Sequence, residues 1–205
     1  MRKSPIVNLK IQANLPEPQK LFIESALQNL NVEFNLYLKN TLDTDVLEYH
    51  ERAMVGFFNN GIIRSSSTRF ISLMEYIVRN NIGRADLLIN DTETKDYYLF
   101  EAKHKHTSNA NELIPWMNDV SIRSLNYNID HQLIQYYLAE ESFYKDKSTF
   151  LCAIVFEIID NISEDFNNIQ GHLLSPELEN VFYTVYHFED HKEKGLAVYG
   201  LIRKQ

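Results

Sequence analysis

The stretch that decides the fold runs Gly83-Arg-Ala-Asp86-Leu-Leu-Ile-Asn90 and continues, after a polar loop, as Tyr97-Tyr-Leu-Phe-Glu101-Ala-Lys103. Each half is a short apolar run that an acidic residue interrupts, and the second half also carries a lysine. Successive side chains of a strand point to opposite faces, so Glu101 and Lys103 share a face. Such charges make a poor core, but together with a second carboxylate they suit a divalent metal ion and an activated water.

The two runs predict a β-hairpin around the polar loop at residues 91–96. If the loop is centred between Glu93 and Thr94, Asp86 lies directly opposite Glu101, with Cβ atoms about 4.5–5.5 Å apart. Two like charges this close are destabilising unless a cation bridges them or one is protonated. Because hard cations prefer oxygen ligands, the register predicts Mg²⁺ or Mn²⁺ at this place.

A third carboxylate is expected from the helix upstream of the hairpin. Leu47, Glu51, Met54 and Phe58 fall within one helical stripe, which places Glu51 on a face that packs inward. Glu75 is the alternative, because it alternates with apolar residues of a predicted strand. We rank Glu51 first and Glu75 second.

Outward from the hairpin, apolar periodicity predicts an α/β or α+β domain with a mixed sheet and helices packed on it. Residues 1–16 are expected to be an irregular or extended lead-in. Asp43 or Thr44 is the expected cap of the second helix and Gly61 its left-handed end, while Asp130 is expected to cap one piece of a broken helix. The predicted helices cover 17–39, about 44–59 and 111–145, and the predicted strands cover 70–78, 84–90, 97–105, 149–159, 181–188 and 195–202.

Composition limits the class of protein. The chain has 205 residues, 44% hydrophobic and 23% charged, which fits one globular domain over residues 1–205. Its single cysteine, Cys152, excludes an internal disulfide and an all-cysteine metal site, and it stands in an apolar run where burial is expected. Without a signal peptide or a long apolar span, a soluble cytoplasmic protein with no membrane partner is expected. The net charge of −8 argues against a broad basic surface for nucleic acid, but not against a local basic groove.

The pattern of acids and lysine also has an ordinary structural explanation, because charges commonly protect the exposed edge of a hairpin. Two observations favour function instead. Residues 87–89 and 99–100 are strongly apolar, which indicates central strands. Gln132 and Tyr136 follow four residues apart, on one face of a predicted helix.

With these residues together, the chain resembles the PD-(D/E)XK nuclease superfamily, which has the restriction-endonuclease-like fold. The matching residues are Asp86 after a glycine-bearing turn and Glu101-Ala-Lys103 at the end of the next strand. Gln132 and Tyr136 are similar to the QxxxY signature of the RecB-like branch. Ala85 stands where the proline that names the family would be.

The resemblance covers about residues 45–160 and leaves a helical extension at about 17–40 outside it. It implies a restriction-endonuclease-like mixed β-sheet flanked by helices. The metal ligands that it implies for Mg²⁺ or Mn²⁺ are Asp86, Glu101 and the backbone carbonyl of Ala102, with Glu51 as the added helical acid. The catalytic residues that it implies are Asp86, Glu101, Lys103, Gln132 and Tyr136. Lys103 would position or activate the attacking water, and Gln132 and Tyr136 would orient the lysine, the water or a phosphate.

The resemblance further implies an enzyme that hydrolyses phosphodiester bonds of nucleic acid, with DNA as the expected partner, in defence or repair. A homodimer would suit the cutting of a duplex. The alternative is a catalytically inactive domain of the same fold that serves as a protein-interaction or regulatory module.

Overall fold

Seven strands form one mixed sheet in the computed structural model, which describes residues 7–40, 51–66, 68–78, 82–107, 121–160, 179–188 and 194–205. The strands are β1 (Val7–Asn14), β2 (Phe70–Ile77), β3 (Arg84–Asp91), β4 (Tyr97–Thr107), β5 (Thr149–Ile159), β6 (Val181–Phe188) and β7 (Gly195–Lys204). Their order is β1-β6-β7-β5-β4-β3-β2. The central pair of β4 and β5 is parallel, and the other neighbours are antiparallel.

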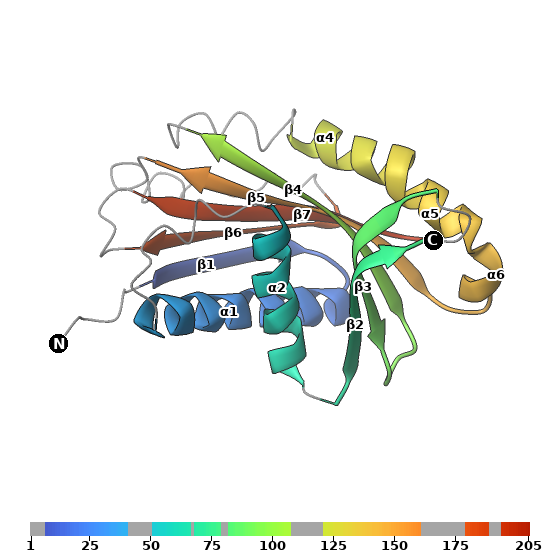
Figure 1. Ribbon diagram of the computed structural model, residues 1–205, viewed down its shortest axis with the longest axis horizontal. Coiled ribbons are helices and arrows are strands. Elements are labelled where there is room, and N and C mark those ends of the chain that lie inside the picture. Colours follow the sequence, from blue (N-terminus) through green and yellow to red (C-terminus); the bar gives the residue numbers. More distant parts are fainter. Residues whose placement is uncertain are drawn as a thin grey trace.

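Helices cover both faces of this sheet (Figure 1). They are α1 (Glu17–Asn40), α2 (Glu51–Ser65), α4 (Ser121–Asn128), the π-helix η4 (Ile129–Leu133), α5 (Ile134–Ala139) and α6 (Glu141–Tyr144). α1 and α2 pack on one face around Phe34, Phe58 and Phe100, while α4 to α6 pack on the other around Leu99 and Tyr136. The three layers confirm the prediction of a mixed α/β sheet flanked by helices.

The apolar sequence of β5 explains its place in the middle of the sheet. Every residue of this strand is buried, as expected where helices cover both faces. Cys152 is among them, and burial raises the pKa of its thiol well above the usual range. β4 lies between β5 and β3, so the prediction that the apolar hairpin strands are central is confirmed.

The second predicted helix ends later than expected. α2 continues through Gly61 to Ser65, so the prediction that this glycine is a left-handed end is wrong. A Cβ at position 61 would stand 2.6 Å from the carbonyl oxygen of Ala26, and the glycine therefore lets α1 and α2 approach closely. The candidate caps Asp43 and Thr44 lie outside the described residues.

Two other segments can be compared with the prediction. The lead-in is expected to be irregular or extended, and the part of it in β1 is extended, because this strand pairs with β6 at the edge of the sheet. Asp130 caps no helix, since the chain stays helical through η4, where the N–H of Ile134 donates to the carbonyl of Ile129. Asp130 instead forms an ion pair with Arg203 on β7.

A buried carboxylate fixes the turn between β3 and β4. Asp91 Oδ1 accepts hydrogen bonds from Arg69 Nε at 2.9 Å and from the N–H of Glu93 at 3.0 Å. The N–H of Lys95, whose φ is 62°, donates to the Asp91 carbonyl at 2.8 Å. These bonds hold the loop in one conformation, and a fixed loop sets the register of the strands that it joins.

We expect Asp91→Asn to lower the free energy of unfolding by about 2 kcal/mol, because the half-buried Arg69 loses its buried carboxylate partner. Burial by itself raises the pKa of Asp91, but Arg69 and two backbone N–H groups outweigh burial and hold it below the usual value. A depressed pKa gives stability that is present above the unfolded-state pKa and is lost as pH falls through the folded-state pKa. Urea unfolding between about pH 7 and pH 3 should therefore show a smaller acid loss for the variant than for the wild type. Identical acid profiles would mean that this carboxylate does not stabilise the turn.

Candidate active site at the β3–β4 fork

The hairpin strands separate at the position of the two acids. Four residue pairs join β3 and β4 in the predicted register, ending with Leu87 and Phe100. Asp86 and Glu101 come directly after this last pair, and strand alternation places Glu101 on the face of Leu99, which α4 and α5 cover. Figure 1 shows β4 continuing beside β5 while β3 turns away. We call this opening, along the edge of β4 beyond Phe100, the fork.

Along the fork, β3 no longer pairs with β4, and two carboxylates accept hydrogen bonds from the backbone N–H groups of β4 instead. The N–H of Ala102 donates to Asp86 Oδ2 at 2.6 Å, and the N–H of His104 donates to Glu51 Oε2 at 3.1 Å. Glu51 reaches this edge from the first turn of α2, whose inward-facing residues are buried. Because the N–H and C=O of a strand residue point to the same side, the Ala102 carbonyl also faces the fork.

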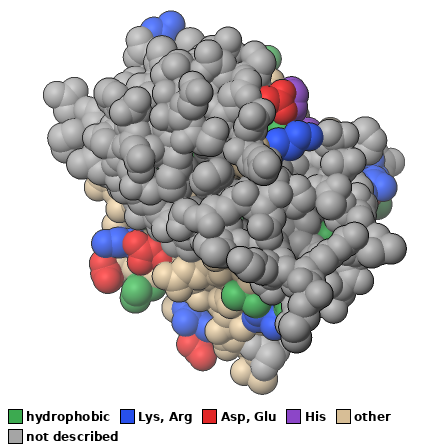
Figure 2. All heavy atoms as spheres, turned by 90° about the vertical axis from the view of Figure 1, so that its left-hand side faces the viewer, with side chains coloured by type: hydrophobic (Ala, Val, Ile, Leu, Met, Phe, Trp, Pro, Cys, Tyr) green, Lys and Arg blue, Asp and Glu red, His purple; other side chains and the backbone are tan. Residues whose placement is uncertain are grey.

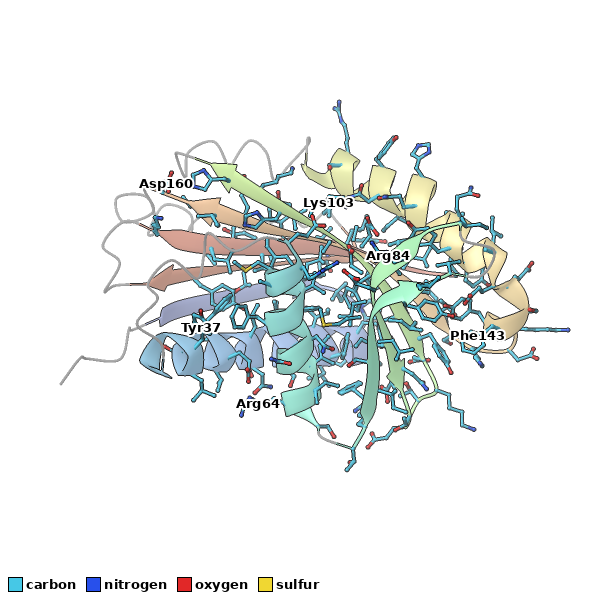
Figure 3. The ribbon with its side chains drawn as sticks, in the orientation of Figure 1. Tyr37, Arg64, Arg84, Lys103, Phe143 and Asp160 are labelled. Carbon is cyan, nitrogen blue, oxygen red and sulfur yellow. The ribbon has the colours of Figure 1, made fainter. Side chains whose placement is uncertain are left out.

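Glu101 and Lys103 lie together on the adjoining face of β4, and Figure 3 shows Lys103 at the fork. Lys103 Nζ donates to Glu101 Oε1 at 2.8 Å, so the two side chains share a face as expected. Glu101 is 5% exposed, and its Oε2 is buried without a hydrogen-bond partner among the described residues. A buried carboxylate oxygen without a donor is costly. A cation or a donor supplied by a ligand would be stabilised there.

The pKa values at the fork follow from burial and from mutual repulsion. Burial raises the pKa of Glu101, and the charges of Asp86 and Glu51 raise it further, while the hydrogen bond from Lys103 opposes the rise. Burial also raises the pKa of Asp86, against the N–H of Ala102 and the charge of Lys103. Burial lowers the pKa of Lys103, but its carboxylate neighbours outweigh burial and leave it raised. The lysine is therefore a fixed positive charge among acids that repel one another.

Glu75, the second-ranked acid, also faces Asp86 but has other partners. The pair of Glu75 and Asp86 is missing from the otherwise continuous ladder of β2 and β3. The Glu75 carboxylate forms ion pairs with Arg52 on α2 and Arg84 on β3. Because two arginines hold Glu75 while Glu51 points to β4, the geometry favours Glu51 as the third acid.

One of the two predicted helical residues reaches the fork. Tyr136 lies against Gly83, where a Cβ would stand 2.7 Å from the tyrosine hydroxyl. Burial raises the pKa of Tyr136, and the charges of Glu101 and Asp86 raise it further, which places the phenol within their electrostatic reach. Gln132 lies in η4, the π turn that contacts β4, and such turns are frequent at functional sites. In the described part of the chain, the Gln132 side chain makes no hydrogen bond to the other site residues.

The donor set of the fork fits a hard divalent cation in its chemistry. The carboxylates of Glu51, Asp86 and Glu101 and the carbonyl of Ala102 are all oxygen ligands. As they stand, no group of three or more His, Cys, Asp or Glu side chains among the described residues is arranged to hold a metal ion. Each of the three acids accepts a hydrogen bond from β4 or from Lys103. A cation would have to compete with these bonds, and Glu101 Oε2 is a buried oxygen that no donor among the described residues holds.

Two arginines at the fork, Arg52 and Arg84, are not among the site residues that the sequence predicts. Arg52 follows Glu51 in sequence, and Arg84 stands two residues before Asp86, so both flank predicted site residues. Exposed arginines carry no distinguishing signal by themselves. Their shared ion-pair partner on β2 becomes apparent only when the two strands and the helix are placed together.

The far end of β4 carries a separate acid–base pair. His106 Nε2 lies 3.2 Å from Asp160 Oδ1, beyond the end of β5. Figure 3 labels Asp160 at that end, and Figure 2, which views this side, shows a histidine beside acidic and basic side chains. The pair is exposed and therefore belongs to the surface rather than to the fork.

No family model, no curated protein and no solved structure matches this chain. Among the described residues, no helix has the length and apolar character needed to cross a membrane.

Proposed function

We propose that this protein is a metal-dependent nuclease of the PD-(D/E)XK type, with Mg²⁺ or Mn²⁺ as cofactor and nucleic acid as substrate. The observation that carries the proposal is the fork, where Asp86, Glu101 and Lys103 meet at one edge of β4. Phosphodiester hydrolysis of this kind needs oxygen ligands for a cation and a positive charge beside the reacting phosphate.

The order of the elements supports the same proposal. An acid-bearing helix, a hairpin that opens at its acids, a helical run with Tyr136 and a strand parallel to β4 follow one another along the chain. This is the order on which the resemblance to the restriction-endonuclease-like fold rests. Because one fold can serve many functions, the residues of the fork carry more of the argument than the fold does.

Each site residue has a physical role in this proposal. The residues that would hold the cation are Glu51, Asp86, Glu101 and the carbonyl of Ala102. When bound, the cation would supply positive charge and a more acidic water. Lys103 keeps its proton beside Glu101 and stabilises the negative charge that develops on the phosphate. Tyr136 borders the fork and, with Gln132, would orient the lysine, the water or a phosphate.

We propose nucleic acid, and DNA first, as the partner of the fork. The chain has a net charge of −8, so binding would depend on the metal ion and on positively charged side chains near the fork rather than on a broad basic surface. Cleavage of both strands of a duplex would require two forks related by a two-fold axis, which is the basis for proposing a homodimer.

The test is a cleavage assay with labelled single- and double-stranded DNA and RNA, in Mg²⁺, in Mn²⁺ and in EDTA. We expect metal-dependent cleavage of at least one substrate, and a loss of at least about 100-fold in Asp86→Asn. Asp96→Asn, on the exposed loop of the same hairpin, is the matched control and should leave the rate unchanged. If no substrate in the panel is cleaved in a metal-dependent manner, the proposal is wrong.

One observation favours the second candidate function, a protein-interaction module. The edge strand β2 exposes Ile71 and Leu73, which share a face, and also Ile77, and exposed apolar side chains can bind other proteins. This function needs no cation, so Leu73→Asp would abolish partner capture without affecting any cleavage. A nuclease rate that depends on Asp86 would favour the first candidate.

A further inference from the structure

The backbone of Glu75 is strained in the middle of a strand. Its φ is 51°, in the left-handed region that non-glycine residues rarely occupy. The flanking pairs of β2 with β3, Met74 with Leu87 and Tyr76 with Ala85, are intact, so the register of the two strands is the same on both sides of this residue. Strain of this kind persists where the surrounding structure imposes it, and it is concentrated at functional sites.

The strained residue holds two arginines from different elements. Glu75 Oε2 accepts a hydrogen bond from Arg84 Nη1 at 3.1 Å, and Glu75 Oε1 pairs with Arg52 Nη2. The side chains of Arg52 and Arg84 are 70% and 59% exposed, whereas that of Glu75 is 34% exposed. The acid is therefore the inner member of the group, and the two guanidinium groups face solvent.

This group borders the fork. Glu75 stands across the strand from Asp86, and Arg84 is close enough to act on the Asp86 carboxylate electrostatically. Arg52 is the neighbour of Glu51 in the first turn of α2. Figure 3 shows Arg84 and Lys103 at the same opening of the sheet.

We propose that Arg52 and Arg84, positioned by Glu75, form a clamp for a substrate phosphate that flanks the scissile one. The clamp rests on the proposed function, because its ligand is the phosphodiester backbone of the strand held at the fork. Glu75 is a positioning residue in this arrangement and does not touch the substrate.

The chemistry of the two side chains fits this ligand. A guanidinium carries five N–H donors in a planar fork that matches phosphate oxygens. Among the described residues, Glu75 contacts one terminal nitrogen of each arginine, which leaves donors of both groups for a second acceptor. In a chain with a net charge of −8, this pair also supplies the positive charge that a polyanion needs beside four acids.

A purely structural role accounts less well for the group. Ion pairs between exposed side chains contribute little to stability, whereas a left-handed non-glycine residue within a strand is unfavourable. A surface link between α2 and β2 would not require this strain. A site that must hold two guanidinium groups in a fixed geometry would require it.

The experiment measures the binding of a fluorescent single-stranded DNA by the full chain in Ca²⁺ and in EDTA, by anisotropy over a range of salt concentrations. We expect Arg52→Ala and Arg84→Ala each to weaken binding by about fivefold and to reduce the slope of log K against log salt by about 0.7. The matched control is Arg64→Ala at the other end of α2, where the arginine pairs with Glu33. It should bind as the wild type does.

Arg84→Lys distinguishes the clamp from a general charge effect, and it replaces the alanine variant if that variant does not fold. Lysine keeps the charge but not the planar donors, so the salt slope should remain while affinity falls several-fold. Wild-type affinity and slope in both alanine variants would overturn the clamp even if the protein cleaves DNA. Absence of DNA binding by the wild type in both buffers would also overturn it. Arginine-dependent binding by a protein that cleaves no substrate in the assay with Mg²⁺ or Mn²⁺ would support the clamp and refute the proposed nuclease.

Discussion

Lys103→Ala is expected to abolish metal-dependent cleavage, with a loss of at least about 100-fold in kcat and little change in KM. The side chain is held by Glu101 Oε1 at 2.8 Å, and the acids around it keep its pKa raised. Its charge is therefore fixed beside the fork before a substrate arrives. A fixed charge accelerates a reaction when it stabilises charge that develops in the transition state, which is why kcat rather than KM should change.

The measurement is a single-turnover cleavage rate across a range of substrate concentrations. Lys145→Ala, at an exposed position after α6, is the matched control and should keep the wild-type rate. If Lys103→Ala cleaves within about threefold of the wild type, the lysine has no catalytic role and the proposed mechanism is wrong.

Glu101→Gln is expected to abolish cleavage and at the same time to stabilise the metal-free protein. Glu101 is buried, its Oε2 lacks a donor among the described residues, and the negative charges of Asp86 and Glu51 lie nearby. Replacing a buried carboxylate by a neutral amide removes part of this repulsion. We expect a gain of about 1 kcal/mol at neutral pH, or about 2–4 °C in Tm for a chain of this size.

Glu140→Gln is the matched control for this prediction. Glu140 is also buried, at 2% exposure, but its Oε2 accepts a hydrogen bond from the hydroxyl of Tyr76. The amide of glutamine can accept from Tyr76 only through a neutral oxygen, and a neutral hydrogen bond is weaker than one to a carboxylate, so this variant should have a lower Tm and the two glutamine variants should change stability in opposite directions. A fall in Tm for Glu101→Gln in EDTA would indicate a structural role for this acid.

The hairpin register could be predicted from the sequence because it depends on local features. The loop after Asp91 is short and polar, and strand alternation follows from the chain itself, so the sequence predicts the register that the structure has from Asn90 and Tyr97 to Leu87 and Phe100. The inward position of Glu51 could be predicted for the same reason, since a helical stripe is a local pattern.

The remaining features depend on contacts between distant segments. The close approach at Gly61 requires the backbone of α1, which lies far away in sequence. The left-handed conformation of Glu75 requires arginines from α2 and β3. The separation of the hairpin strands, which turns Asp86 toward the N–H of Ala102, likewise follows from tertiary packing. Local patterns cannot reveal such features, which is why the sequence predicts the acids of the fork but not Arg52 and Arg84.

The most direct test of the fork as a metal-dependent site is a crystal structure of the protein soaked in Mn²⁺, analysed by anomalous scattering. We expect one strong peak among the oxygens of Asp86, Glu101 and the Ala102 carbonyl, at coordination distances of about 2.0–2.2 Å. The hydrogen bond from the Ala102 N–H to Asp86 should then be displaced or lengthened. An Mn²⁺ peak elsewhere in the molecule, with both acids still in their present hydrogen bonds, would contradict this account.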